Sequence, residues 1–307
     1  MLEMKIGECA PGEGYTPQPA SSCRVVAKPI QELWLVALAN LRERLIEFKV
    51  RYPWMAPKRY AGTKVIHFWN QLAIALVVYF GYELTSEISG GSRRQAISNA
   101  LTEVRLEQSL HIFNERGIQH FFLVHFVWIV KFSDLYYTTV HFILPVVVLV
   151  VLFRNFPERY LVWRNVMAAL NFVALVVFAV FPVAPPRLLP SSYHFVDTQV
   201  VIGGAGSLDA TLMKDAGNLY AAMPSLHFAW AIWCAWALVP VVKNKWIRRA
   251  LIADPIVTTL VVIITANHFW LDIAAGFALF LVTGAVFRAF APTRWQSEKV
   301  PLGSGKR

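Results

Sequence analysis

Two short stretches of this sequence combine residue types that can bind and cleave phosphate esters. In the first, Ser225 and His227 follow Pro224 at the start of a long apolar run. Proline is favoured at the first position of a helix, where its missing N–H would have no partner, so we expect a helix to begin at Pro224. The N–H groups that follow would form the positive end of that helix, which favours a bound anion.

The second stretch places His268 four residues before Asp272, at the start of another apolar run. This spacing puts both side chains on one helix face, where the carboxylate can orient the imidazole and raise its basicity. Cleavage of a phosphate ester needs a nucleophile, a proton donor for the leaving oxygen and positive groups around the phosphoryl oxygens. The predicted catalytic residues are His268 as nucleophile, Asp272 as its partner and His227 as acid, and the predicted phosphate-binding residues are Arg187, Ser225 and Asn267. No cofactor is expected, because these spacings do not resemble a zinc or magnesium site.

The composition places these residues in a membrane protein. Hydrophobic residues make up 56% of the 307 residues and charged residues only 16%, and apolar runs of about twenty residues recur. The net charge of +10 could indicate nucleic-acid binding, but the basic residues flank apolar runs and form no separate domain. We therefore expect membrane lipids as partners and no nucleic acid.

The fold class predicted is all-α, a polytopic membrane bundle with six transmembrane spans and amphipathic interfacial helices. Residues 1–29 predict a disordered cytoplasmic tail, 30–64 an amphipathic surface helix with a basic linker, 65–290 the six-span catalytic domain and 291–307 a second cytoplasmic tail. The predicted spans are 65–84, 135–153, 161–181, 224–242, 250–266 and 268–290. Residues 96–111 predict a further amphipathic helix, and 118–132, too short to span, predict a re-entrant or interfacial segment.

Charge predicts the orientation of these spans. Basic residues dominate segments 49–64, 154–164, 243–249 and 288–307, whereas the intervening connections are close to neutral. The positive-inside rule then places both termini in the cytoplasm and the predicted site at the outer ends of the spans. Because the first residues lack the apolar core of a signal peptide, the bacterial plasma membrane or a eukaryotic endomembrane is expected, and the compact loops favour the former.

Each candidate residue has a simpler explanation when it is taken alone. A single histidine at an interface is usually half solvated, and Arg187 could be an interfacial arginine that reaches toward water. A carboxylate such as Asp272 costs about 2.5–3.5 kcal/mol at the centre of a span, so it usually has a partner or a function. Six further outer-side residues are expected to be ordinary solvated loop residues, and two others to make polar contacts inside the bundle. The six are Glu107, Asn114, Glu115, His194, Asp197 and Lys214, and the two are Asp134 and His141.

The two stretches together resemble a known family. Pro224-Ser225-Leu226-His227 and His268-x-x-x-Asp272, with the two histidines 41 positions apart, look like the second and third motifs of the type 2 phosphatidic acid phosphatase superfamily. The resemblance covers about residues 171–276. It implies a six-span core and a covalent phosphohistidine at His268. It also implies that His227 protonates the leaving group, that Asp272 orients His268 and that Arg187 is the arginine of the first motif.

The sequence departs from the phosphatase pattern at four positions. Val180 stands where the pattern has a lysine, Val261 and Val262 stand where it has serine and arginine, and Leu226 replaces a glycine. Pro185-Pro186-Arg187 is more similar to the branch with inositol phosphorylceramide synthase and the sphingomyelin synthases, which implies transfer of a phospho-headgroup. The alternatives are a polyprenyl (di)phosphate or phosphatidate phosphatase and, in another class, a non-catalytic lipid transporter or scaffold. Transporters often contain inverted repeats, and no clear internal repeat is found here.

Overall fold

The computed structural model describes residues 58–60, 64–67, 69–71, 73, 92–202 and 219–290. Both predicted tails, the predicted surface helix and most of the predicted first span lie outside these residues. At the start of that span, β2 (Lys64–Ile66) pairs antiparallel with β1 (Lys58–Tyr60). The prediction of a span beginning at residue 65 is therefore wrong there, because Val65 and Ile66 belong to a strand.

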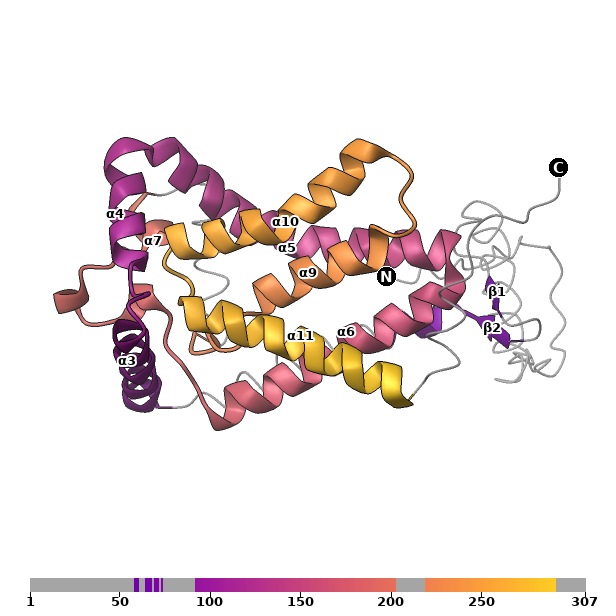
Figure 1. Ribbon diagram of the computed structural model, residues 1–307, viewed down its shortest axis with the longest axis horizontal. Coiled ribbons are helices and arrows are strands. Elements are labelled where there is room, and N and C mark those ends of the chain that lie inside the picture. Colours follow the sequence, from indigo (N-terminus) through magenta and orange to yellow (C-terminus); the bar gives the residue numbers. More distant parts are fainter. Residues whose placement is uncertain are drawn as a thin grey trace, which may run out of the picture. The chain divides into compact units, whose positions relative to one another are not determined.

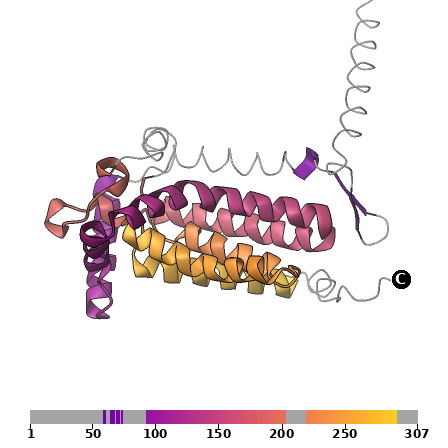
Figure 2. The same ribbon diagram turned by 90° about the horizontal axis from the view of Figure 1, so that it is seen from above.

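Five helices run side by side in the part of the chain that the structure describes (Figures 1 and 2). They are α5 (Val127–Asn155), α6 (Pro157–Val180), α9 (Leu226–Leu238), α10 (Lys245–Ile264) and α11 (Trp270–Phe290). Three of them, α5, α6 and α11, are long and apolar enough to cross a membrane. The helical prediction is thus confirmed for the bundle, and the prediction of six spans is not.

Length and charge explain why α9 and α10, both predicted as spans, are not among the three helices that could cross a membrane. Helix α9 has 13 residues, which gives it a length of about 20 Å against a hydrocarbon core of about 30 Å. Helix α10 has 20 residues, but charged side chains occupy its first half: Lys245, Arg248, Arg249 and Asp254.

Helix α9 lies at the centre of the bundle and packs against α5, α6, α10 and α11. Its Trp233 is fully buried and donates a hydrogen bond from Nε1 to the carbonyl oxygen of Trp163 in α6, at 3.0 Å. Arg159 of α6 is also buried and donates to the carbonyl oxygens of Trp236 and Ala237, at 2.8 and 2.6 Å. A cation favours the negative C-terminal end of a helix, so Arg159 caps α9.

Two shorter helices, α3 (Arg93–Ser109) and α4 (Glu115–His125), lie across one end of the bundle (Figures 1 and 2). Helix α3 confirms the helix predicted for 96–111, and the side chain of Ser92 caps it by accepting from the N–H of Gln95 at 3.2 Å. The predicted interfacial segment 118–132 is wrong as one element, because Phe126 has a non-helical backbone that ends α4 and starts α5.

The connection after α6 reaches the same end of the bundle. It contains two short 3-10 helices, η2 (Pro186–Leu188) and η3 (Ser191–Tyr193), and the one-turn helix α7 (Thr198–Val201). The N–H of Ala184 donates to the carbonyl oxygen of Ala96 in α3, at 3.1 Å. Buried apolar side chains of α3, of this connection and of Phe269 form one cluster, which fixes the segments that carry the predicted site.

Candidate functional site

His268 lies in the turn between α10 and α11, two residues before α11 begins. The predicted start of a helix at His268 is therefore wrong, and its contact with Asp272 arises in another way. The Oδ2 atom of Asp272 accepts the N–H of Phe269 at 2.8 Å and lies 3.3 Å from Nδ1 of His268. This is the back-reaching arm of a capping box. Because a carboxylate accepts, Nδ1 of His268 carries the proton and Nε2 keeps its lone pair.

His227 lies in the first turn of α9 and faces the other side of that ring. Its Nδ1 is 3.2 Å from Nε2 of His268. The predicted helix start at Pro224 is wrong by two residues, because α9 begins at Leu226 with Ser225 as its N-cap. The N–H of Ser225 is bonded to the carbonyl oxygen of Asp272 at 2.9 Å. Within residues 92–202 and 219–290, the N–H groups of Leu226 and His227 have no acceptor, so these two groups form the positive helix end.

Arg187 reaches the site from η2. Its Nη1 donates to Oδ1 of Asn267, and its Nε is 3.5 Å from Oδ2 of Asp197. Asn267 is buried and also donates from Nδ2 to the hydroxyl of Thr265 at 2.7 Å. The side chain of Asn267 thus holds the guanidinium beside His268. Likewise the Ser225 hydroxyl is buried and caps α9 by accepting from the N–H of Phe228, at 3.4 Å.

All six residues predicted for the site are brought together at one end of the bundle, by contacts that join the α9 start, the α10–α11 turn and η2. Asn267, Ser225 and Arg187 are all engaged with protein groups, which distinguishes them from the N–H groups of Leu226 and His227, for which the described residues supply no acceptor. Among the described residues, no three His, Cys, Asp or Glu side chains gather with the geometry of a metal site.

A stack of aromatic rings around His227 was not predicted. The His227 ring stacks on Tyr137, with centroids 4.2 Å apart, and on His141, at 3.8 Å. His141 also stacks on Trp230, at 4.6 Å. Tyr137 and His141 are four residues apart on α5, and His227 and Trp230 are three apart on α9, so both pairs share a helix face. That spacing is the signal in the sequence that could have found the stack.

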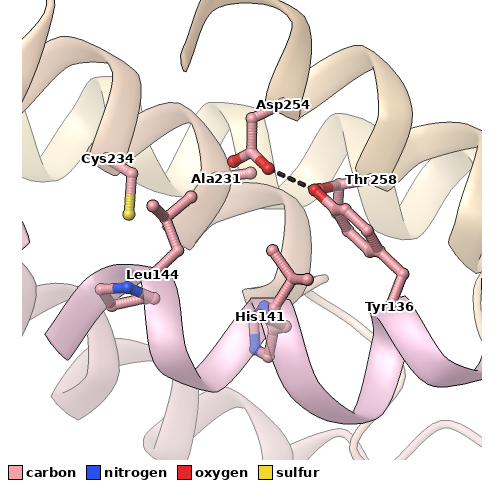
Figure 3. Close-up of a pocket in the computed structure, with 9 residues that line it drawn as sticks. Tyr136, His141, Leu144, Ala231, Cys234, Asp254 and Thr258 are labelled. Carbon is pink, nitrogen blue, oxygen red and sulfur yellow. Dashed lines mark hydrogen bonds between the residues drawn. The ribbon is translucent and has the colours of Figure 1, made fainter. Parts of the chain in front are cut away.

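A small pocket lies beyond His141, between α5, α9 and α10 (Figure 3). Its polar lining includes Tyr136, whose hydroxyl donates to Oδ1 of Asp254. Asp134, also on α5, accepts a hydrogen bond from the hydroxyl of Thr198 at 2.8 Å. The expectation that Asp134 makes a polar contact inside the bundle is confirmed, whereas the contacts found for His141 are ring contacts.

The six residues that were expected to be solvated differ in their surroundings. Glu107 and Glu115 are fully buried, so the expectation that they are solvated is wrong. Asn114 accepts a hydrogen bond from the indole of Trp270 at 2.8 Å, and Asp197 pairs with Arg187. His194 ends η3 with a left-handed backbone, and Lys214 lies outside the described residues.

Comparison with known proteins decides the family. The family model of the PAP2 superfamily matches residues 103–286, which is more than half of the chain. The chain belongs to the PAP2 superfamily. No curated protein and no solved structure matches it. The matched interval contains α5, α6, most of α11 and all six site residues, and together with the three apolar helices it makes this PAP2 protein an integral membrane protein. Membership also supports an enzyme with phosphoric ester chemistry.

Proposed function

We propose that this PAP2 protein is a lipid phosphotransferase or phosphatase that works through a phosphohistidine on His268. One observation carries the proposal: the ring of His268 lies between a carboxylate and a second imidazole, at 3.3 Å from Asp272 and 3.2 Å from His227. The carboxylate fixes the proton on Nδ1, so Nε2 keeps the lone pair that attacks phosphorus. A nucleophile oriented by a third group in this way is the usual arrangement for covalent catalysis.

The proposed reaction has two steps. In the first, Nε2 of His268 forms a bond to phosphorus, the bond from phosphorus to the lipid oxygen breaks, and His227 gives its proton to that oxygen. In the second, an acceptor alcohol or water attacks phosphorus, the bond to His268 breaks, and His227 takes the proton of the incoming group. Proton transfer by a positioned side chain contributes about 10²- to 10⁴-fold to such a reaction.

The negative oxygens on phosphorus need positive partners nearby. Arg187 is held beside His268 by Asn267, and the N–H groups of Leu226 and His227 point from the positive end of α9. Backbone donors at a helix start bind phosphate without further side chains. We assign Arg187 and these two N–H groups to the phosphoryl oxygens, with Asn267 and Ser225 holding them in place.

The small positive charge of these phosphate-binding groups favours a phosphodiester as the substrate. Arg187 is the one Lys or Arg side chain that these site contacts include, and it already shares its charge with Asp197. A phosphodiester carries less negative charge than a phosphomonoester and so needs fewer cations. We therefore propose transfer of an inositol-phosphate-type headgroup from a phospholipid to an acceptor alcohol, at the outer face of a membrane with both termini in the cytoplasm.

The test uses the purified full chain in detergent micelles with ³²P-labelled phosphatidylinositol. Wild-type protein quenched during turnover is expected to carry label that resists alkali and is lost in acid, as a phosphohistidine does, and His268→Ala is expected to carry none. His120→Ala is the matched control, because His120 is an exposed histidine on α4. Normal turnover by His268→Ala would overturn the phosphohistidine on His268, and wild-type protein that neither turns over the lipid nor becomes labelled would favour a transporter or scaffold.

A second comparison separates transfer from hydrolysis. Phosphatidate and a polyprenyl phosphate are supplied as phosphomonoesters, with and without an acceptor alcohol. If the protein releases inorganic phosphate from them without an acceptor and faster than it consumes phosphatidylinositol, it is a phosphatase, and the proposed headgroup transfer is wrong.

A further inference from the structure

Three glutamates from the two helices across the bundle end are buried against the start of α11. Glu103 and Glu107 belong to α3 and Glu115 to α4, and their exposed fractions are 5%, 0% and 0%. No ion pair of the described chain joins them to a lysine or arginine. Buried carboxyls are rare unless they are paired or have a function, so this group needs an explanation.

Part of the explanation is the N-terminus of α11. The N–H of Trp270 donates to Oε1 of Glu115 at 3.3 Å, and the N–H of Leu271 donates to Oε1 of Glu107 at 2.9 Å. With Phe269 bonded to Asp272, carboxyl groups accept three successive N–H groups at the start of this helix. The first N–H groups of a helix have no partner within it, so carboxyl oxygens from other helices can accept them. Glu107 and Glu115 therefore dock α3 and α4 on α11.

Glu103 accepts none of these N–H groups. Both of its carboxyl oxygens and Oδ1 of Asp272 are buried and, among the described residues, receive no N–H or hydroxyl donor. The two carboxyls instead lie within hydrogen-bonding reach of each other, and the carboxyls of Glu107 and Glu115 do so as well. Two carboxyls can form such a bond only when one of them keeps its proton.

Burial favours the neutral form of Glu103. It raises the pKa of Glu103 to about 10, with further contributions from Asp272 on α11 and from Glu107 one turn along α3. Burial and the neighbouring Glu115 raise the pKa of Glu107 to about 9. At neutral pH the carboxyls of Glu103 and Glu107 are therefore protonated, and each can donate a hydrogen bond to the other carboxyl of its pair.

We propose that Glu103 is a positioning residue of the site, whose protonated carboxyl donates a hydrogen bond to Oδ1 of Asp272. Oδ2 of Asp272 then remains directed at Nδ1 of His268 and at the N–H of Phe269. The chain of contacts from Glu103 through Asp272 to His268 would hold the nucleophile in one tautomer and one orientation. This inference rests on the proposed function, because it assigns Glu103 to the nucleophile of that reaction.

Two substitutions separate this role from simple packing. Glu103→Gln keeps a donor toward Asp272 but cannot ionise, whereas Glu103→Leu removes the donor. With ³²P-phosphatidylinositol in detergent micelles at pH 7, Glu103→Leu is expected to lower kcat by about 10- to 100-fold, the usual effect of losing a hydrogen bond that supports a reacting group, with KM unchanged. Glu103→Gln should retain wild-type kcat. Glu158→Gln is the control, because Glu158 is exposed on α6.

The pH profile supplies a readout that packing alone would not change. Wild-type kcat is expected to fall above about pH 9 as Glu103 loses its proton, and Glu103→Gln should keep its activity there. The same alkaline fall in Glu103→Gln, or wild-type kcat in Glu103→Leu, would overturn the inference. These failures differ from failure of the proposed function, in which His268→Ala turns over normally or wild-type protein never becomes labelled. Thermal unfolding of each variant shows whether a lost activity comes from a lost fold.

Discussion

The two histidines of the site lie 3.2 Å apart at their nearest nitrogens, yet their surroundings differ in kind. His268 is held by carboxyls: Asp272 binds it directly and Glu103 stands behind Asp272. His227 is surrounded by rings and stacks on both Tyr137 and His141. We call the carboxyl groups around His268 the charged side of the site and the rings around His227 its aromatic side.

This difference matches the two roles that we propose. A nucleophile must present the same lone pair in every turnover, so a carboxylate that fixes one proton on the ring is useful. A group that gives and then takes a proton must change its charge in each cycle, and a fixed ion pair would resist that change. Stacked rings restrain the plane of His227 without binding its ring nitrogens; Nδ1 faces His268 at 3.2 Å, and Nε2 is left available for proton transfer.

The largest effect is expected when the charged side is broken at Asp272. Asp272→Asn keeps the size of the side chain, but its amide can donate to Nδ1 of His268 and so favours the tautomer with the proton on Nε2. That tautomer has no lone pair toward phosphorus, and kcat should fall by about a thousandfold or more. Turnover of ³²P-phosphatidylinositol measures the loss. Near-normal kcat in a folded Asp272→Asn protein would show that the carboxylate does not orient the nucleophile.

The next largest effect is expected at the contact between α9 and α11, which brings His227 and His268 together. A Cβ atom added at Gly276 would lie 2.4 Å from the carbonyl oxygen of Ser225, in the N-cap of α9. Gly276→Ala should push the two helices apart, lower the free energy of unfolding by about 1–3 kcal/mol and separate His227 from His268. Thermal unfolding and kcat are both expected to fall.

Gly284 provides the matched control on the same helix. A Cβ atom added there meets nothing within 4 Å, and alanine is a better helix former than glycine by about 1 kcal/mol. Gly284→Ala should therefore leave kcat unchanged and keep or raise the melting temperature. Equal losses in the two variants would mean that the close approach of α9 and α11 at Gly276 is not what assembles the site.

A smaller effect is expected when the aromatic side is broken at Tyr137. Tyr137→Leu removes one face of the stack on His227, and aromatic pairs contribute about 0.5–1.5 kcal/mol beyond their burial. A drop in kcat of up to about tenfold corresponds to that energy. Tyr137→Phe keeps the ring and should retain activity. A large loss in Tyr137→Phe would instead assign the hydroxyl a role and weaken the contrast between the two sides.

From the sequence we predicted the contact between His268 and Asp272, which lie close in the chain, but not the contribution of Glu103, which lies far from them in the chain. His268 and Asp272 lie close in the chain, so their spacing alone indicates contact, although the structure forms it through a capping box and not along one helix face. Glu103 is far from Asp272 in sequence, and an acidic residue on an amphipathic helix resembles any solvated one. Its burial depends on how α3 crosses the start of α11, which no local pattern records.

The spans show a similar limit. The lengths of α5, α6 and α11 follow from long apolar runs. The predicted positions are close to the observed ones for α6 and α11, whereas α5 begins at Val127, before the predicted start at residue 135. Helix α9 is shorter than the apolar run that contains it. Ser225 caps one end of the helix, and Arg159 binds the carbonyl oxygens at the other. Arg159 was predicted only as one of the basic residues of a cytoplasmic segment. Caps supplied by other helices cannot be predicted from hydropathy.

The smallest effect expected is on the pH dependence of stability. Burial raises the pKa of Glu103 to about 10 and that of Glu107 to about 9, from an unfolded value of about 4.5. Between these limits the folded chain binds protons that the unfolded chain has released, so stability falls as pH rises from about 5 to about 9. The melting temperature in detergent should decrease over that range, and less steeply in Glu103→Gln. An identical slope in both proteins would show that Glu103 does not hold its proton in the folded state, and the charged side would then depend on Asp272 alone.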